Sequence, residues 1–327
     1  MSDGDRPVES TSRVIPLRGR TARRRIAPLI TPGDVARRLA ALERQVEAAL
    51  GTDRMARAVP ALETALDQVL GAYVGGREWL AREAGGLATT VVGEMSLAAL
   101  YRWWWRVDVV GRERLPQGRM LVVGNRGSAL LPYEALMASV GLGTNGSRRV
   151  QPFVDEWLMA LPLVGTALGA LGARAVSPSR IRRVLAAGEG ALVFPEGRDA
   201  VARPYRESYR VGRLARTALL RLAIETGAPI VPVAIIGVDE VHPVVARAPL
   251  PWLASALGVP ALPITPTLVP LPTKWTLFVG DPLDVASRHQ ATDARRPDVV
   301  RTLAAQVRER LQGLVSDGLR RRRSIFF

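Results

Sequence analysis

From about residue 107 onward, short apolar runs alternate with longer stretches of helical periodicity. This alternation is the signature of strands joined by helices, and it restricts the chain to an α/β organisation. The expected strands are residues 120–123, 150–153, 173–176, 191–194, 230–235 and 276–279. The expected helices are residues 133–140, 156–171, 179–187, 209–225 and a closing helix at 292–315. We therefore predict a central, mostly parallel sheet that is flanked by helices.

The first third of the chain has a different pattern. Residues 1–30 are polar and basic, which predicts a disordered arm. Residues 31–106 carry apolar side chains at spacings of three and four, which predicts a helical extension. Such an extension either packs on the main domain or on a second copy of the chain, or it binds a membrane or a partner. We place the α/β domain at residues 107–290 and a C-terminal helix with a basic tail at residues 291–327.

The formal net charge of +15 indicates an anionic partner. Lys274 is the only lysine, so nearly all of the basic residues are arginine, as a strong codon bias would also produce. We expect the partner to be an anionic membrane surface or a phosphorylated substrate, and not a nucleic acid, because no nucleic-acid-binding motif is present. The sequence has no cysteine and two histidines, His242 and His289, so we expect no disulfide, no metal site and no bound cofactor.

Two runs without charged side chains, residues 158–173 and 248–273, were candidates for membrane spans. The first is too short, and the second contains seven prolines, so neither is expected to cross a bilayer. No signal peptide is expected either. The second run, with Trp252 as an anchor, either lies at a membrane interface or packs over the core. Residues 320–327 combine arginines with aromatic side chains, which suits anionic headgroups or a floppy tail.

A loop of unusual composition follows the apolar run 120–123: Gly-Asn-Arg-Gly-Ser-Ala-Leu-Leu-Pro-Tyr-Glu. The end of a buried strand is the usual place for chemistry in an α/β domain. Arg126, in the middle of this loop, can bind an anion or pair with Glu134, but it keeps its proton and cannot act as a base. The run from Phe194 to Arg198, Phe-Pro-Glu-Gly-Arg, also ends a strand and presents a carboxylate. Taken alone, that second run is typical of an ordinary turn.

Several stretches in serial order resemble the glycerophospholipid acyltransferase superfamily, which includes glycerol-3-phosphate and lysophosphatidate acyltransferases. They are VDVVGRERLPQGRMLVVGNRGSALLPYEAL, GARAVSPSRIRRVLAAGEGALVFPEGR, RLAIETGAPIVPVAIIGVDEVHP and LPTKWTLFVGDPLDV. The resemblance covers about residues 101–285 and implies the fold of that family. It also implies acyl transfer from acyl-CoA or acyl carrier protein to a hydroxyl of a glycerophosphate-like lipid.

In that family the first motif supplies a histidine, which takes a proton from the acceptor hydroxyl, and an acidic residue, which orients the histidine ring. Arg126 stands at the place of the histidine here, and Glu134 stands at the acidic end of the motif with a longer spacing than in its short form. The first and third motifs imply substrate-binding residues at Asn125, Gly127, Ser128, Phe194, Pro195, Glu196, Gly197 and Arg198.

Two functions stay open at this point. The first is an acyltransferase of bacterial phospholipid metabolism, cytoplasmic and peripheral at the inner face of the cell membrane, with acyl-CoA or acyl carrier protein as donor. The second is a non-catalytic lipid-binding or regulatory protein of the same fold, which the missing histidine favours. His242, His289 and Glu196 are the alternatives for the missing base, and we expect none of them to act as one. We expect His242 at a structural or rim position, His289 in solvent, and Glu196 as a substrate-binding or structural carboxylate. Residues 205–216 form a basic and aromatic segment that either binds a lipid phosphate or is solvated.

Overall fold

The computed structural model describes residues 97–143, 149–248, 250–267 and 269–326. The predicted arm at residues 1–30 and almost all of the predicted extension at residues 31–106 lie outside these residues. The described part of the extension ends in a π-helical turn, η1 (Leu100–Trp104), which leads directly into the first strand of the sheet. Among the described residues, no helix is both long enough and apolar enough to cross a membrane.

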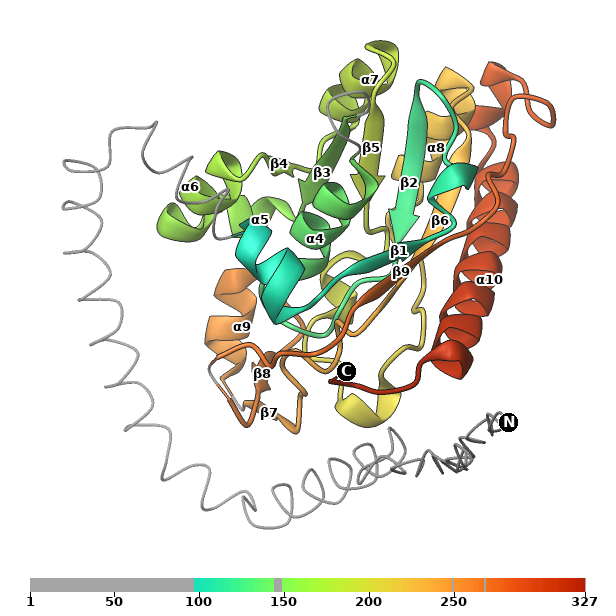
Figure 1. Ribbon diagram of the computed structural model, residues 1–327. Coiled ribbons are helices and arrows are strands. Elements are labelled where there is room, and N and C mark those ends of the chain that lie inside the picture. The colour runs from blue at the N-terminus through green and yellow to red at the C-terminus, as the bar shows by residue number, and fades with distance from the viewer. Residues whose placement is uncertain (1–96, 144–148, 249, 268, 327) are drawn as a thin grey trace, which may run out of the picture.

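A seven-stranded sheet forms the centre of the described structure (Figure 1). In spatial order its strands are β1 (Asp108–Val110), β9 (Thr276–Val279), β6 (Ile230–Ile236), β2 (Met120–Gly124), β5 (Gly190–Val193), β3 (Val150–Val154) and β4 (Arg174–Ala175). Every neighbouring pair is parallel except β6 and β9. The α/β class and the mostly parallel sheet flanked by helices are therefore confirmed. A separate pair of short strands, β7 (Ala246–Ala248) and β8 (Leu262–Ile264), is antiparallel.

Helices cover both faces of the sheet, as Figure 1 shows. They are α4 (Tyr133–Leu142), α5 (Glu156–Ala160), α6 (Pro162–Ala170), α7 (Pro178–Ala186), α8 (Thr217–Thr226), α9 (Pro251–Leu257) and α10 (Pro297–Arg321). Short 3-10 turns occur at η2 (Arg112–Arg114), η3 (Gly197–Ala200), η4 (Tyr205–Glu207) and η5 (Ala291–Arg295).

The core consists of two main apolar clusters, one on each face of the sheet. Successive residues of β2 belong to different clusters: Leu121 and Val123 face α7, α8 and α10, whereas Met120 and Val122 face α4. This follows from the two-residue period of a strand. Because both faces are covered, the central strands read as continuous apolar runs, which is what made them predictable from the sequence.

Three of the five predicted helices differ substantially from the structure, and the other two agree within two residues at each end. The helix predicted at 209–225 begins only at Thr217, because the backbone N–H groups of Val211 and Gly212 are bonded to the side chains of Gln312 and Glu196 and not to a helical turn. The helix predicted at 156–171 is two helices, since Pro162 starts a new one. The closing helix, predicted at 292–315, is α10, which begins at Pro297 and extends to Arg321.

Four elements were not predicted. Strand β1 lies in the short run before the first motif, and it pairs only with β9 at the edge of the sheet. Strands β7 and β8 and helix α9 lie in or beside the proline-rich run 248–273. Prolines weaken the periodic signal of strands and helices, so this run has no clear pattern in the sequence.

Candidate functional site

The carboxyl ends of four neighbouring parallel strands bring charged side chains together. In the sheet these strands have the order β6-β2-β5-β3. The chain leaves β2 toward Arg126, β3 toward Asp155, β5 toward Glu196 and β6 toward Asp239. All four side chains are at least nine-tenths buried. Ligand sites of open α/β sheets lie at this end of the strands, so this is the candidate active site.

Arg126 and Glu134 form a buried ion pair. The guanidinium Nη1 of Arg126 donates to Glu134 Oε1, and the two side chains are 3% and 0% exposed. Helix α4 begins one residue before Glu134, which turns its carboxylate back toward the loop after β2. The sequence left open whether Arg126 binds an anion or pairs with Glu134, and the structure brings the two residues together.

One oxygen of Glu134 has no partner in the described structure. Its Oε2 atom is buried without a hydrogen bond, beside a cavity of about 10 Å3 that Arg126, Asp155, Phe194 and Arg216 help to line. A volume of this size holds about one water molecule. Burial raises the pKa of Glu134, and the nearby charge of Arg126 opposes that rise. The cavity has no room for an acyl chain as it stands.

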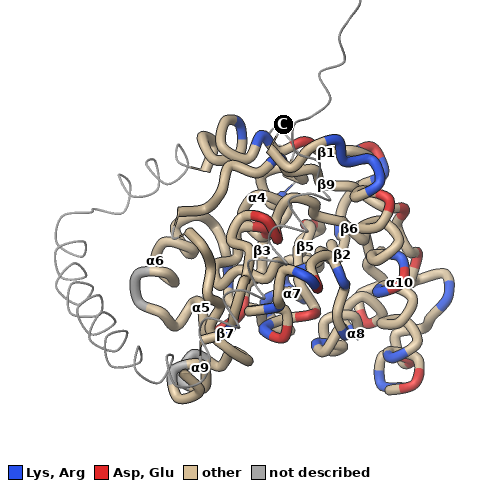
Figure 2. The backbone as a smooth tube through the Cα atoms, turned by 90° about the horizontal axis from the view of Figure 1, so that it is seen from below, with Lys and Arg blue, Asp and Glu red and all other residues tan. Residues whose placement is uncertain are grey.

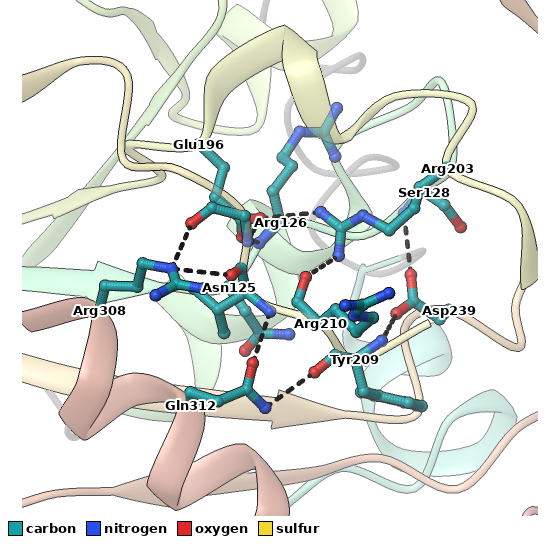
Figure 3. Close-up of polar contacts among 12 residues, drawn as sticks. Asn125, Arg126, Ser128, Glu196, Arg203, Tyr209, Arg210, Asp239, Arg308 and Gln312 are labelled. Atoms are coloured by element: carbon teal, nitrogen blue, oxygen red, sulfur yellow. Dashed lines mark hydrogen bonds and ion pairs between the residues drawn. The ribbon is translucent and has the colours of Figure 1, made fainter. Parts of the chain in front are cut away.

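Both carboxylate oxygens of Glu196 are bonded within the protein. Its Oε1 accepts from the backbone N–H of Arg126 at 3.1 Å. Its Oε2 accepts from Arg203 Nη2 at 2.8 Å and from the backbone N–H of Gly212 at 2.7 Å (Figure 3). Glu196 therefore connects three loops: the one after β2, the one after β5 and the one before α8. In this arrangement it orders the site and presents no free oxygen.

The other residues predicted in the first motif are held by the strand next to them. The side chain of Asn125 donates to the carbonyl of Ile235 at 3.0 Å and accepts from its N–H at 2.7 Å. The backbone N–H of Ser128 donates to Asp239 Oδ1 at 2.9 Å, and Tyr209 N–H donates to Asp239 Oδ2 at 2.9 Å (Figure 3). A side chain at Gly127 would lie 2.5 Å from Val238, so glycine is required there.

An open cleft of about 370 Å3 lies beside the loop that follows β5. Its lining includes two guanidinium groups, those of Arg198 and Arg216. Arg198 donates to the carbonyl of Gly258 at 2.9 Å, and Arg216 Nη2 lies 2.7 Å from Asp155 Oδ1. The complete lining is Glu156, Trp157, Glu196, Gly197, Arg198, Asp199, Ala215 and Arg216.

The loop that forms this cleft depends on a glycine. Gly197 has a φ of +61°, and a Cβ atom there would lie 2.9 Å from Arg216 Nε. Glycine thus lets the backbone approach the Arg216 side chain. The ring of Phe194 packs against the end of β2, since a Cβ atom at Gly124 would lie 2.7 Å from this ring. The carbonyl of Pro195 accepts a hydrogen bond from the backbone N–H of Arg216 at 3.0 Å.

Neither histidine lines the cavity or the cleft. Nε2 of His242 lies 3.4 Å from the hydroxyl of Tyr133, and its Nδ1 lies 3.3 Å from the carbonyl of Thr267. The two contacts fit a ring that donates from Nδ1 to the carbonyl and accepts from the hydroxyl at Nε2. Burial lowers the pKa of His242, which keeps the ring neutral at pH 7. As described, the Arg126 cavity therefore contains no imidazole that could act as a base.

Three residues of the site were missed in the sequence: Asp155, Arg203 and Asp239. Asp155 and Asp239 lie shortly after predicted strands. Their position after strand ends could therefore have identified them as candidate site residues. Arg203 follows a turn within a loop, and only the folded structure shows that its side chain donates to Glu196 and to the Arg210 carbonyl.

The chain is similar to known proteins over part of its length. Residues 106–236 match the family model described as Acyltransferase. Uncharacterised proteins of Mycobacterium leprae (strain TN) and Mycobacterium tuberculosis (strain ATCC 25618 / H37Rv) are 37% and 36% identical over 242 residues, or 71% of this chain. The alignments cover 65% and 66% of the length of those relatives.

A solved structure is also similar. The crystal structure of the 1-acyl-sn-glycerophosphate (LPA) acyltransferase, PlsC, from Thermotoga maritima matches 89% of this chain and 98% of its own. The sequence identity is 19% and the TM-score is 0.43.

Proposed function

We propose that this chain, whose residues 106–236 match the family model described as Acyltransferase, binds a phosphate-bearing glycerolipid without transferring an acyl group to it. The observation that carries this proposal is the buried ion pair between Arg126 and Glu134. By the resemblance of the first motif, Arg126 stands where related acyltransferases hold the histidine that accepts a proton. An arginine cannot accept a proton at any pH at which the protein is folded.

The lack of a base has a large kinetic effect. General-base catalysis typically contributes about 10²- to 10⁴-fold to a rate. Glu196 is the other carboxylate that could act as a base, and its oxygens already accept hydrogen bonds from Arg126, Arg203 and Gly212. The hydrogen bonds thus order the loops of the candidate site, whereas no base is free for the proton-transfer step while Arg126 is paired with Glu134. This combination supports a binding function.

The cleft supports an anionic ligand. Arg198 and Arg216 come from two different loops, and each guanidinium can offer parallel N–H donors to a phosphate. Arg216 already has a buried carboxylate partner in Asp155, which fixes its orientation and leaves other donors free for a ligand. A cleft of about 370 Å3 is large enough for a glycerophosphate headgroup.

Acyl transfer is the second candidate, and Glu134 favours it. Its Oε2 atom has no partner, and burial raises its pKa, so the carboxylate is a competent base if the ion pair opens. Glu134 would take the proton of an acceptor hydroxyl, the oxygen would attack the carbonyl of an acyl thioester, and the thiolate of coenzyme A or acyl carrier protein would leave. This reaction requires Arg126 to move from its present position.

One experiment separates the two candidates. Purified full-length protein is titrated with glycerol 3-phosphate and lysophosphatidate by calorimetry, and thioester consumption is measured with acyl-CoA and with acyl carrier protein. We expect binding, which Arg216→Ala weakens at least about tenfold, and no turnover. Arg213→Ala is the matched control, because Arg213 is exposed and does not line the cleft. If the parent protein consumes the thioester and Glu134→Gln abolishes this turnover, acyl transfer is the function and the proposed binding function is wrong.

A further inference from the structure

Three separate stretches of the chain contain basic residues and no acidic residue. They are residues 97–107, 241–280 and 318–326. Their basic residues are Arg102, Arg106, Arg247, Lys274, Arg320, Arg321, Arg322 and Arg323. Lys274, Arg320 and Arg322 form ion pairs with Asp108, Asp317 and Glu240, which lie outside these stretches. The positive charge that matters below is therefore that of Arg102 and Arg323.

The fold brings the three stretches together. Trp104 Nε1 donates to the Pro270 carbonyl and Trp105 Nε1 to the Leu271 carbonyl, each at 3.0 Å. Arg106 Nη2 donates to the Pro272 carbonyl at 3.0 Å and to the Phe326 carbonyl at 2.6 Å. Three consecutive residues, the last of η1 and the two that follow it, thus donate to three consecutive carbonyls of the proline-rich run. The third, Arg106, also donates to the Phe326 carbonyl near the C-terminus. Figure 2 shows basic segments beside this end.

Large apolar side chains are exposed on the joined surface. Trp103 is 75% exposed, Trp104 is 38% exposed and Val269 is 64% exposed. The side chains of Arg102 and Arg323 are exposed as well. We call these five residues the aromatic–basic patch. Exposed tryptophan next to arginine is the combination that favours the headgroup region of a bilayer, where the ring is partly buried and the cation meets lipid phosphates.

The patch lies at the same end of the sheet as the candidate site. Strand β9 runs antiparallel to β6, with Thr276 opposite Ile236. The amino ends of β1 and β9, which directly follow Arg106 and Lys274, therefore face the same way as the carboxyl ends of the parallel strands. A surface that docks on the patch is thus on the side of the molecule where the cleft opens, and not behind the sheet.

We propose that the aromatic–basic patch docks this protein on the surface of an anionic lipid bilayer. The tryptophans enter the headgroup region, and Arg102 and Arg323 bind anionic headgroups. This inference is independent of what the cleft binds. A nucleic acid would fit the charge, but it gives no reason for an exposed valine and two exposed tryptophans beside the two arginines.

The test measures binding of the full-length protein to vesicles. We expect binding to phosphatidylcholine vesicles that contain phosphatidylglycerol, little binding to pure phosphatidylcholine, and weakening by salt. Trp103→Ser should weaken binding at least about tenfold, and Arg102→Glu at least about fivefold. Trp103 is 75% exposed, so the substitution should leave the fold intact. Bromine-labelled lipids should quench the parent fluorescence more than that of Trp103→Phe.

The control is Arg310→Glu, which makes the same charge change on the exposed face of α10. If it weakens vesicle binding as much as Arg102→Glu, only net charge matters and the patch is not the docking site. Equal binding to neutral and anionic vesicles would also overturn the proposal. So would protection of Trp103 from acrylamide quenching in the free protein, because another part of the chain would then cover the patch. A preference for DNA over anionic vesicles that depends on Arg102 would replace the bilayer by a nucleic acid.

Discussion

At the scale of single residues, the arginine in the first motif acts as the partner of a buried carboxylate. Arg126 and Glu134 are both removed from water, so each charge depends on the other. Removing one partner of such a pair leaves an uncompensated buried charge, whereas replacing both by apolar groups is often neutral. The pair therefore closes the cavity and holds α4 to the loop after β2.

A double-mutant cycle tests this interpretation. Arg126→Met should lower the free energy of unfolding by about 3–5 kcal/mol, because Glu134 then stays buried without its cation. The double variant Arg126→Met/Glu134→Leu should recover most of that loss. Urea unfolding of the parent, both single variants and the double variant gives the coupling energy. Additive single effects would show that the two charges do not depend on each other.

A second residue-scale prediction concerns His242. Burial lowers its pKa below the ordinary value of 6.5, so the folded protein binds this proton less readily than the unfolded chain does. The stability that this neutral ring contributes is complete above pH 6.5 and is lost as the pH falls through the lowered pKa. His242→Gln should flatten the dependence of the urea midpoint on pH below that value. A parent profile in His242→Gln would contradict the prediction.

Some of these residue contacts could be predicted from the sequence and others could not. Arg126 follows the end of β2 by two residues and Glu134 lies in the first turn of α4, so the sequence could offer their pairing as one alternative. The bonds of Glu196 to Arg203 and Gly212 were not predictable, because they join loops whose separation in space depends on the whole sheet. In the same way, nothing in the sequence places Tyr209 N–H on Asp239.

At the scale of elements, continuous apolar strands were predicted well and segments with irregular backbone were not. Residues 209–216 have helical spacing of arginines, yet Tyr209 has a φ of +63° and the segment is bonded to Glu196, Asp239 and Gln312. Tertiary hydrogen bonds prevail over local propensity there. Helix α10 contributes Gln312 to this segment, and its C-terminal residue is followed by Arg322, which reaches a second buried network.

That network leads to a prediction about the end of α10. Arg322 Nη1 lies 2.5 Å from Glu240 Oε1, and the Glu240 carboxylate also accepts from the hydroxyl of Tyr209. Arg322→Ala should lower the free energy of unfolding by about 3–5 kcal/mol, because it leaves the Glu240 carboxylate buried without its cation. Its neighbour Arg321 is exposed, so Arg321→Ala should change the value by less than about 0.5 kcal/mol. Urea unfolding measures both, and equal effects would contradict a specific role for Arg322.

At the scale of the whole molecule, the single antiparallel pair in the sheet has a functional consequence. Because β9 is reversed relative to β6, the aromatic–basic patch and the cleft share one end of the sheet while having no residue in common. A bilayer bound at the patch would raise the local concentration of lipid near the cleft, as a tether does for a second binding event. A ligand dissolved in water would gain nothing from this arrangement.

The two surfaces should therefore be separable by the choice of ligand. Trp103→Ser should leave the affinity for soluble glycerol 3-phosphate within about twofold of the parent, since the two sites do not touch. The same variant should weaken binding of lysophosphatidate presented in phosphatidylglycerol-containing vesicles by about tenfold or more, because the protein no longer concentrates at the bilayer. Arg216→Ala should weaken binding of both ligands and retain docking on vesicles that lack lysophosphatidate. Calorimetry with the soluble ligand and vesicle flotation give the two readouts. Loss of glycerol 3-phosphate binding in Trp103→Ser would show instead that the patch and the cleft are one site.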